Sequence, residues 1–537
     1  MNEQDFATRR LVARRKVLKN LGGLGLLSVG STFLGACGSG ISTTPPAAIP
    51  GYRSVSVNAA ASSGTIRSLQ GVNGPPVPAF PGVENVPSNA SSPTFGFNPV
   101  FNPSGVNLTA VYGQMRVDFV RTHDLDADGS GDVDGTGINC IFPDWNADPL
   151  NPSSYNFAAT DTVIAGIVSS GSQVLFNLGR SDLSMVGLAN DATPPADFDK
   201  YAAIAKQIVL HYNEGWANGF TYGIRYWEIW NEPELLNFWT GTVPQYYSLY
   251  QKVATAIKSV DPTLKVGGPT LATNTPSFGM MGSFLQFLSS NSLPLDFYSF
   301  HWYANYLDPM DFSRLASSYR ALLDQYGFTS TELQLTEWGY ALFIPSQPAP
   351  ETEAAFLVNS MTYMQDAPLD RAFLYQRSGL PLLQADGSLL KAGAAFQAVG
   401  SLTGMSRLST SGQDTDGFSV LAGCSADKKQ IRVLIGNYEI PAADMGPIPG
   451  GNAVVFPGIT TITYLDRRTI SYANNAGYQV TVNDLPWGAE SFTVTRFRVD
   501  ASHQLTLIDT QSGNGPQFTL SASLPPPSVE LIVMTAA

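Results

Sequence analysis

Two glutamates with neighbouring tryptophans occur at the ends of short hydrophobic runs. Glu232 ends the run IRYWEIWNE, and Glu337 ends ELQLTE, directly before Trp338. Acids are among the residues least often buried without a partner, and their burial usually occurs where a carboxylate has chemistry to do. Hydrolysis of a glycosidic bond requires one carboxyl group that stays protonated and a second that is ionised. The pair therefore indicates hydrolytic chemistry on a sugar.

The sequence around Glu232 is rich in aromatic residues. Trp227, Trp230 and Trp239 lie close to it in the chain. An apolar wall raises the pKa of a carboxyl group, so we expect these tryptophans to keep Glu232 protonated. Taken alone, Glu232 is also compatible with an ion pair at the start of a loop. The second acid, at the end of another hydrophobic run, favours the catalytic interpretation.

Short β-rich runs alternate with helical stretches over residues 65–405. The candidate strands are TIRSLQGVN, GQMRVDFVRTH, SQVLFNLG, IRYWEIWNE, LKVGGPT, DFYSFHWYA, ELQLTEWGY and DRAFLYQRS. Eight strands alternating with helices predict an α/β fold, a (β/α)8 TIM barrel, in which functional residues come from the C-terminal ends of the strands. An open doubly wound sheet is the alternative, but no glycine-rich phosphate loop follows the first strand.

The remaining C-terminal residues, 406–537, have a different pattern. Short alternating runs are separated by Asn, Gly, Asp and Pro, without a helical period: FSVLAG, QIRVLIGNY, TITYLD, YQVTVNDL, SFTVTRFRVD, HQLTLIDT and VELIVM. This pattern is typical of a β-sandwich. The early segment 51–64 also alternates, and we expect it to pair as a strand with this sandwich.

The barrel segment resembles glycoside hydrolase family 39 of clan A, whose members include β-xylosidases and α-L-iduronidases. The resemblance rests on the motifs IWNEPELLNFW, SVDPTLKVGGPT, DFYSFHWY, LQLTEWG, LQGVNGPP, VRTH and SYNFAATD. It covers residues 65 to 400, and the C-terminal β-sandwich fits the accessory domain of that family.

The resemblance implies roles for individual residues. Glu232 would be the general acid/base and Glu337 the nucleophile of a double-displacement reaction that retains configuration. Asn231 would hold the sugar 2-hydroxyl. The further residues expected to line the site or contact the sugar are Arg121, His123, His301, Tyr303 and Trp338. A histidine packed in the core is the alternative for His301.

The chain departs from the family pattern at two places. Phe373-Leu374-Tyr375-Gln376-Arg377 stands where the family usually has a tryptophan, and Glu234 stands where asparagine usually follows the NEP motif. Both changes fall where the bound sugar is shaped, so neither xylose nor iduronate can be assumed. Arg377 would favour an acidic sugar if it points inward, and it is an ordinary salt-bridge residue if it points outward.

The segment DLDADGSGDVDG, which begins at Asp124, partly matches a calcium-binding loop. Asp occupies positions 1, 3, 5 and 9 and Gly position 6, but position 12 is Gly135 rather than glutamate. Either a structural calcium or a solvated acidic loop fits this pattern. The expected chemistry needs no cofactor and no catalytic metal.

The first 37 residues resemble a targeting signal. ARRKVLKN contains Arg14 and Arg15, an apolar stretch too short to span a membrane follows, and LGAC ends at Cys37. This layout resembles a twin-arginine lipoprotein signal with a lipobox, followed by a flexible tether at 38–50. We therefore expect an exported, periplasmic or cell-surface protein that is anchored to the membrane only by lipid on Cys37. The alternative is a Sec-type signal that is cut elsewhere and leaves Cys37 unmodified.

The composition restricts the partners. A formal net charge of −13 argues against nucleic acid, which requires a basic face. Besides Cys37, the cysteines are Cys140 and Cys424, which would form one bridge or remain two thiols.

Three functional hypotheses follow. The first is a retaining glycosidase of oligo- or polysaccharides, with an exo-acting, β-xylosidase-like enzyme as the specific form. The second is a carbohydrate-binding lipoprotein without turnover, and the third is a glycosidase that trims the cell's own exported polysaccharide. The sequence leaves open the sugar, the linkage, exo or endo action, and the oligomeric state.

Overall fold

The computed structural model describes most of the chain after residue 51. The described residues are 52–77, 106–122, 136–180, 192–236, 238–272, 280–304, 307–340, 348–375, 382–384, 386–441, 468–472 and 476–537. Contacts divide the chain into two compact units, Met1–Pro50 and Gly51–Ala537. All described residues belong to the second unit.

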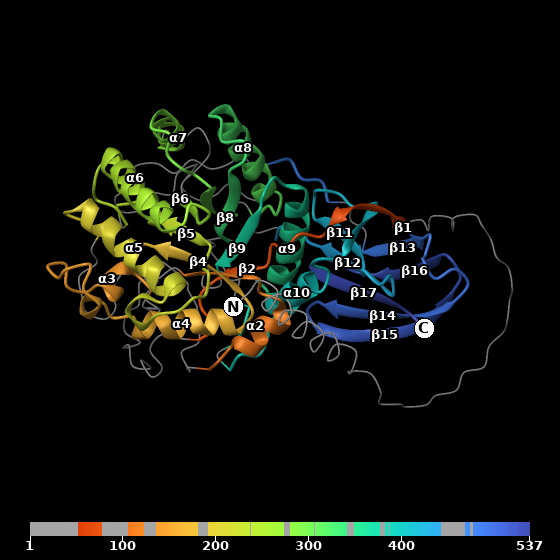
Figure 1. Ribbon diagram of the computed structural model, residues 1–537. Coiled ribbons are helices and arrows are strands. Elements are labelled where there is room, and N and C mark those ends of the chain that lie inside the picture. The colour runs from red at the N-terminus through yellow and green to blue at the C-terminus, as the bar shows by residue number, and fades with distance from the viewer. Residues whose placement is uncertain are drawn as a thin grey trace, which may run out of the picture. The chain divides into compact units, whose positions relative to one another are not determined.

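Eight parallel strands form a closed barrel (Figure 1). They are β2 (Gly71–Asn73), β3 (Phe119–Thr122), β4 (Gln173–Leu178), β5 (Tyr226–Ile229), β6 (Lys265–Leu271), β7 (Phe297–Tyr303), β8 (Glu332–Gly339) and β9 (Arg371–Tyr375). Seven of them fall within runs in which the sequence predicts a strand, and β6 extends one residue beyond its run LKVGGPT. β2 pairs with both β3 and β9 to close the ring. The predicted (β/α)8 barrel is confirmed.

Helices connect these strands. Those of the described residues are α2 (Thr109–Met115), α3 (Ile138–Ile141), α4 (Ala158–Ser169), α5 (Phe198–Glu214), α6 (Val243–Val260), α7 (Met280–Ser290), α8 (Asp311–Gln325), α9 (Pro350–Tyr363) and α10 (Lys391–Gly400). The longest have clear local start signals. Asp197 accepts hydrogen bonds from the first amides of α5, and Thr242 forms a capping box with Gln245 on α6.

The side chains inside the barrel change from apolar to polar along the strands. At the N-terminal end, five buried residues form an apolar layer: Phe119, Leu175, Tyr226, Phe297 and Phe373. Side chains alternate between the two faces of a strand, so the residue two positions later points inward again. On β3, β4 and β5 these next positions are Arg121, Asn177 and Glu228, all of them buried and polar. An apolar floor therefore supports a polar layer toward the C-terminal ends of the strands.

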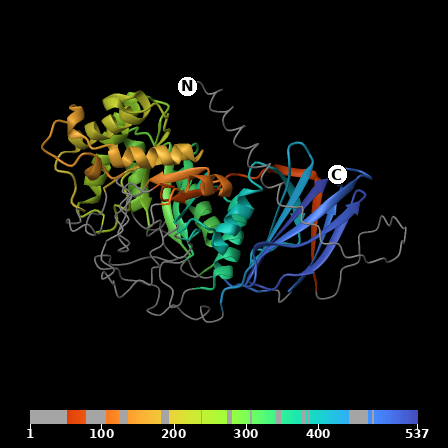
Figure 2. The same cartoon turned by 90° about the horizontal axis from the view of Figure 1, so that it is seen from below.

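The C-terminal strands form a nine-stranded sheet that includes the early strand β1 (Figure 2). Its strands are β1 (Tyr52–Thr65), β10 (Ser406–Ser411), β11 (Phe418–Cys424), β12 (Gln430–Asn437), β13 (Gly477–Asn483), β14 (Ser491–Val499), β15 (Gln504–Asn514), β16 (Phe518–Ser523) and β17 (Ser528–Ala536). Phe492 on β14 and Phe518 on β16 lie far apart in the strand order, yet their ring centroids are 5.8 Å apart. The sheet therefore folds over itself around a shared apolar core, as in a β-sandwich.

Helix α9 packs between the barrel and this sheet. It contacts β11, β12 and β17, and every residue from Thr352 to Tyr363 is buried. A helix that is buried on all sides belongs to the interior of a protein. The barrel and the sheet therefore share a packed interface.

Asp311, the first residue of α8, is a buried acid whose ionisation is unfavourable. Burial, with the neighbouring Asp308, raises its pKa to about 7 despite the nearby Arg314. A raised folded-state pKa contributes stability below the unfolded pKa, and this contribution is lost as the pH rises through the folded value. We expect Asp311→Asn to raise the melting temperature by a few degrees at about pH 8 and to leave it nearly unchanged at about pH 4. Thermal melts at both pH values measure this, and an equal effect at both would contradict it.

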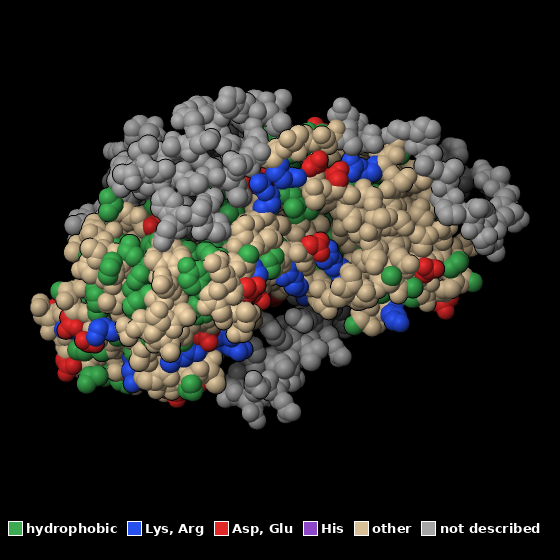
Figure 3. All heavy atoms as spheres, turned by 90° about the horizontal axis from the view of Figure 1, so that it is seen from above, with side chains coloured by type: hydrophobic (Ala, Val, Ile, Leu, Met, Phe, Trp, Pro, Cys, Tyr) green, Lys and Arg blue, Asp and Glu red, His purple; other side chains and the backbone are tan. Residues whose placement is uncertain are grey.

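Among the described residues, no helix is long and apolar enough to cross a membrane. Cys140 and Cys424 form no disulfide bridge, so of the two alternatives the two thiols are present rather than the bridge. Figure 3 shows acidic and basic side chains in small mixed groups on one face.

Candidate active site

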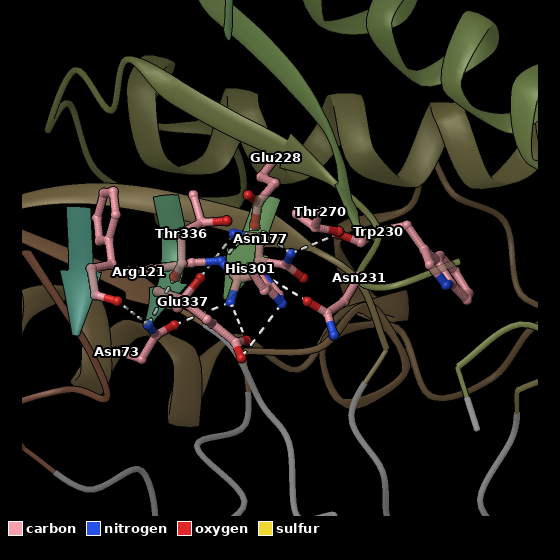
Figure 4. Close-up of polar contacts among 12 residues, drawn as sticks. Asn73, Arg121, Asn177, Glu228, Trp230, Asn231, Thr270, His301, Thr336 and Glu337 are labelled. Atoms are coloured by element: carbon pink, nitrogen blue, oxygen red, sulfur yellow. Dashed lines mark hydrogen bonds and ion pairs between the residues drawn. The ribbon is translucent and has the colours of Figure 1, made fainter. Parts of the chain in front are cut away.

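Arg121 lies at the centre of the polar layer (Figure 4). Its Nε donates to Glu228 Oε2 at 2.6 Å, and one terminal nitrogen donates to Glu337 Oε1 at 2.8 Å and to Asn73 Oδ1 at 3.1 Å. The other terminal nitrogen donates to Asn231 Oδ1 at 2.8 Å. One guanidinium thus joins groups from β2, β3, β5 and β8.

The charge of Arg121 is permanent. Burial lowers the pKa of its guanidinium, but the carboxylates Glu228 and Glu337 outweigh burial, so the pKa is raised above its ordinary value. A fully buried ion pair persists only when its geometry is good and its remaining groups are hydrogen-bonded. The hydrogen bonds of Arg121 meet this condition and fix a positive charge beside Glu337.

The same contact orients the amide of Asn231. A guanidinium only donates hydrogen bonds, so the atom that faces Arg121 must be the amide oxygen. The amide nitrogen, Nδ2, is buried and has no hydrogen-bond partner among the described residues. Asn231 therefore presents a fixed donor, which is suited to a hydroxyl oxygen of a sugar.

The backbone after β5 is held in an uncommon conformation. Trp230 and Glu232 have φ values of 70° and 43°, in the left-handed region that costs energy for residues other than glycine. Asn177 Nδ2 donates to Trp230 O at 2.8 Å, and Glu232 N donates to Thr270 Oγ1 at 3.0 Å. Side chains from β4 and β6 thus hold the turn that places the carboxyl group of Glu232.

The two glutamates meet through residues of β7. His301 Nδ1 lies 2.7 Å from Glu232 Oε1 and 3.5 Å from Glu337 Oε2, and Tyr303 donates its hydroxyl proton to Glu337 Oε2 at 2.8 Å. One ring nitrogen and one oxygen of each carboxyl all lie within 4.8 Å of one another. A retaining glycosidase has its carboxyl groups about 5 to 5.5 Å apart, whereas an inverting enzyme has a gap of about 6.5 to 9.5 Å. The observed spacing matches the retaining class.

The pKa values of both carboxyl groups are raised, but the two environments differ. Burial, followed by the charges of Glu337 and Glu234, raises the pKa of Glu232 well above its usual range. Burial also raises the pKa of Glu337, while Arg121 and the Tyr303 hydroxyl act in the opposite direction. Within the pair, the carboxyl group that faces Arg121 and Tyr303 loses its proton first. At a pH between the two pKa values, Glu337 therefore carries the negative charge and Glu232 keeps the proton.

The expected tryptophan wall around Glu232 is wrong for Trp227. Trp227 stacks on Phe176 with ring centroids 5.2 Å apart, and Trp239 packs edge-on against Trp230 at 5.0 Å. These rings belong to the large hydrophobic core. Strand alternation explains this for β5, since Trp227 precedes the inward-facing Glu228 and points to the opposite face of the strand. The pKa of Glu232 is raised by burial first and then by the neighbouring carboxylates.

Trp338 is also placed away from the polar layer. Its ring is fully buried and packs against Phe312 of α8, with ring centroids 5.2 Å apart. The structure brings together Arg121, Asn231, Glu232, His301, Tyr303 and Glu337 from the predicted set. His123, Cys37, Arg377 and the Asp124 loop lie outside the described residues.

Sequence reasoning missed the residues that support this set. They are Asn73, Asn177, Glu228 and Thr270. Glu228 had a recognisable signal, because it precedes Glu232 in the same run and lies two positions after the inward-facing Tyr226. Glu234, the third acid of that run, accepts a hydrogen bond from the backbone amide of Ala272 after β6.

Comparison with known proteins assigns the chain to a family. The model of glycosyl hydrolases family 39 matches residues 107–403, more than half of the 537 residues. The chain belongs to glycosyl hydrolases family 39. A β-xylosidase of Geobacillus stearothermophilus is 27% identical over 287 residues, which are 48% of this chain and 53% of the relative. The family 39 chain thus spans about half the length of that enzyme.

Two solved structures extend the likeness beyond the barrel. A glucosidase from Croceicoccus marinus matches with a TM-score of 0.76 and 31% identity, covering 90% of this family 39 chain and 99% of that one. The GH39 enzyme from Xanthomonas axonopodis pv. citri matches with a TM-score of 0.64 and 16% identity, covering 90% and 98% of the two chains. The second match shows the fold alone.

Proposed function

We propose that this family 39 protein is a retaining glycoside hydrolase in which Glu337 is the nucleophile and Glu232 the general acid/base. The observation that carries the proposal is the spacing of the two carboxyl groups, since one oxygen of Glu232 and one of Glu337 lie within 4.8 Å of each other beside a shared histidine. The different surroundings of the two carboxyl groups support the proposal, since Arg121 and Tyr303 donate hydrogen bonds to Glu337 and not to Glu232.

The proposed reaction has two steps. Glu337 attacks the anomeric carbon and forms a glycosyl ester, while Glu232 gives its proton to the departing glycosidic oxygen. Glu232 then takes a proton from water, which attacks the same carbon and releases Glu337. The amide nitrogen of Asn231 donates to a sugar hydroxyl in both steps, and Arg121 and Tyr303 stabilise the carboxylate of Glu337 whenever it is free.

The proposed substrates are neutral glycosides of the xylose or glucose type. A β-xylosidase and a glucosidase are among the relatives, and exo action on oligosaccharides is the specific form of the proposal. The test is a screen of aryl β-xylosides, aryl β-glucosides and oligosaccharides with the protein from about residue 50, followed by NMR of the product's configuration. Inverted product would refute the mechanism, and sugar binding without turnover would favour a carbohydrate-binding lipoprotein.

We expect the pH profile of kcat/KM to be bell-shaped, with both limbs above the pKa of an ordinary glutamate. Activity falls as the pH drops through the pKa of Glu337, because the nucleophile becomes protonated, and it falls again as the pH rises through the pKa of Glu232. Burial raises both values. Initial rates across pH measure the two limbs with one aryl glycoside. An acid limb at or below the ordinary glutamate value would contradict the assignment of Glu337.

Export and lipid anchoring are also proposed, from the Arg14-Arg15 pair and Cys37 alone. We expect Cys37→Ser to move the protein from the membrane fraction to the soluble fraction, because a lipidated residue 37 would be its anchor. Fractionation followed by immunoblotting measures this, with the unchanged protein as the control. Membrane association that persists in the variant would contradict the anchor. Calcium at the Asp124 loop likewise stays a proposal.

A further inference from the structure

The loop between β7 and α8 is tied to the C-terminal sheet by two side chains. Tyr438, directly after β12, donates its hydroxyl proton to Leu307 O at 2.9 Å. Arg468 donates from Nε and from one terminal nitrogen to the two oxygens of Asp308, at 2.7 and 3.0 Å. Both contacts reach the segment that follows the strand carrying His301 and Tyr303.

These ties are built from buried groups. Asp308 and Tyr438 are each 1% exposed, and a bidentate pair between arginine and a buried carboxylate is strong and directional. Arg468 is itself held by Asp416 at 3.1 Å and by Thr415 O at 2.8 Å, both in the loop before β11. The arginine therefore connects the barrel loop to the sheet rather than to solvent.

The loop needs to be held in place. Leu307 has a φ of 60°, a left-handed conformation that persists only when its surroundings determine it. Ala304, directly after β7, donates its backbone amide to Gly339 O at the end of β8. A displacement of the loop would therefore be transmitted to the ends of both strands that carry Tyr303 and Glu337.

We infer that Tyr438 and Arg468 are positioning residues of the active site, which act through the β7–α8 loop to hold Tyr303 and His301 against the two catalytic glutamates. The inference rests on the proposed glycosidase function. It gives the C-terminal sheet a part in catalysis, although neither residue touches the pair. A purely structural role would instead stabilise the interface without changing the chemistry.

The chain offers a matched control for that alternative. Arg407 on β10 forms a bidentate pair with Asp366 at 2.6 and 2.9 Å, and it also joins the sheet to the barrel. The side chains of Arg407 and Arg468 are equally exposed, at 20%, whereas the partner Asp366 is 72% exposed and Asp308 only 2%. Asp366 ends a short helix after α9, which carries none of the catalytic groups. Arg407→Ala thus removes an ion pair between the same two parts of the protein.

The experiment compares kcat, KM and the acid limb of kcat/KM in Arg468→Ala, Arg468→Lys, Tyr438→Phe and Arg407→Ala. The charged and titratable groups that face Glu337 are Arg121, Glu228, Glu232, His301 and Tyr303. The Tyr303 hydrogen bond lowers the pKa of Glu337, so its loss moves the acid limb to higher pH.

We expect Arg468→Ala and Tyr438→Phe to lower kcat by roughly 10- to 100-fold, an effect that a small misplacement of catalytic groups produces, with little change in KM. Both variants should also move the acid limb to higher pH, and Arg468→Lys should restore part of kcat. Arg407→Ala should leave kcat and the acid limb unchanged. Equal losses in the variants of Arg407 and Arg468, without a shift of the limb, would overturn the inference.

A double variant tests whether the effect passes through Tyr303. Tyr303→Phe removes the hydrogen bond directly, so Arg468→Ala should add no further shift of the acid limb in that background. A shift of the same size in both backgrounds would show that Arg468 acts on another group and would also overturn the inference.

Hydrogen exchange separates this inference from the proposed function. In Arg468→Ala, the amides of residues 297–304 and 307–311 should exchange faster than in the unchanged protein. In Arg407→Ala, the same amides should exchange as they do in the unchanged protein. If the unchanged protein hydrolyses no glycoside but the exchange result holds, the proposed function fails and the tie between sheet and loop stands. If exchange is unaltered in Arg468→Ala, the tie itself is refuted.

Discussion

Replacing Glu337 by alanine is expected to lower kcat by about 10⁴-fold or more, because the nucleophile of the covalent step is lost. The carboxyl group lies 2.8 Å from both Arg121 and Tyr303, so no neighbouring acid can take over its position without rebuilding these contacts. Initial rates with an activated aryl glycoside measure the effect. Glu214→Ala, at the exposed end of α5, is the matched control and should keep full activity.

Azide distinguishes loss of the nucleophile from a general defect. In Glu337→Ala, external azide can attack only from the face that the carboxylate occupied, so it should not restore a product of retained configuration. NMR of the azide adduct reads the configuration. Recovery of retained product in this variant would show that another group is the nucleophile, even if the loss of rate is as large as expected.

Replacing Glu232 by alanine should affect substrates unequally. For a leaving group that needs a proton, we expect kcat/KM to fall by about 10²- to 10⁴-fold, the range of general acid catalysis. An aryl glycoside with a very acidic leaving group should keep its first step and accumulate the glycosyl-enzyme, because the general base of the second step is also missing. Burst kinetics and mass spectrometry of the intact protein detect this intermediate.

In Glu232→Ala, the azide experiment should give the opposite configuration of product from that in Glu337→Ala. In Glu232→Ala, azide should enter the space left by the carboxyl group, attack the glycosyl-enzyme without needing a base, and give a product of retained configuration. The alkaline limb of kcat/KM should also disappear, since that limb reports Glu232. An unchanged alkaline limb would mean that another residue is the acid, and His301, 2.7 Å away, would be the first to test.

The sequence was most informative where local pattern determines structure. Every barrel strand coincides with a predicted run, with β6 one residue longer than its run. Glu232 follows β5 and Glu337 lies near the end of β8, because the repeating strand and helix pattern sets which end of the barrel they share. Two strands of the sheet, β10 and β16, were not predicted. Their sequences SRLSTS and FTLSAS have few large apolar side chains, so their pairing depends on neighbouring strands.

The contacts within the site were less predictable. Alternation shows which face a side chain takes, but it does not show which groups meet across a barrel from distant parts of the chain. Arg121 and Glu337 are 216 residues apart in sequence and share a hydrogen bond. Trp227 shows the same limit, since it is close to Glu232 in sequence but strand β5 directs its side chain to the opposite face, where it stacks on Phe176.

Strand β1 makes the barrel an insertion within the sheet domain. β1 lies between β10 and β13, and the hydroxyls of Ser62 and Ser406, 344 residues apart, are 2.8 Å from each other. During synthesis the first strand must therefore wait for the whole barrel before its neighbours exist. Strand β17 (Ser528–Ala536) lies between β12 and β14. These two strands can therefore join one sheet only after β17 has been synthesised. Contacts of such long range fold slowly, and removal of the sheet by C-terminal truncation would leave β1 as an unpaired edge prone to aggregation.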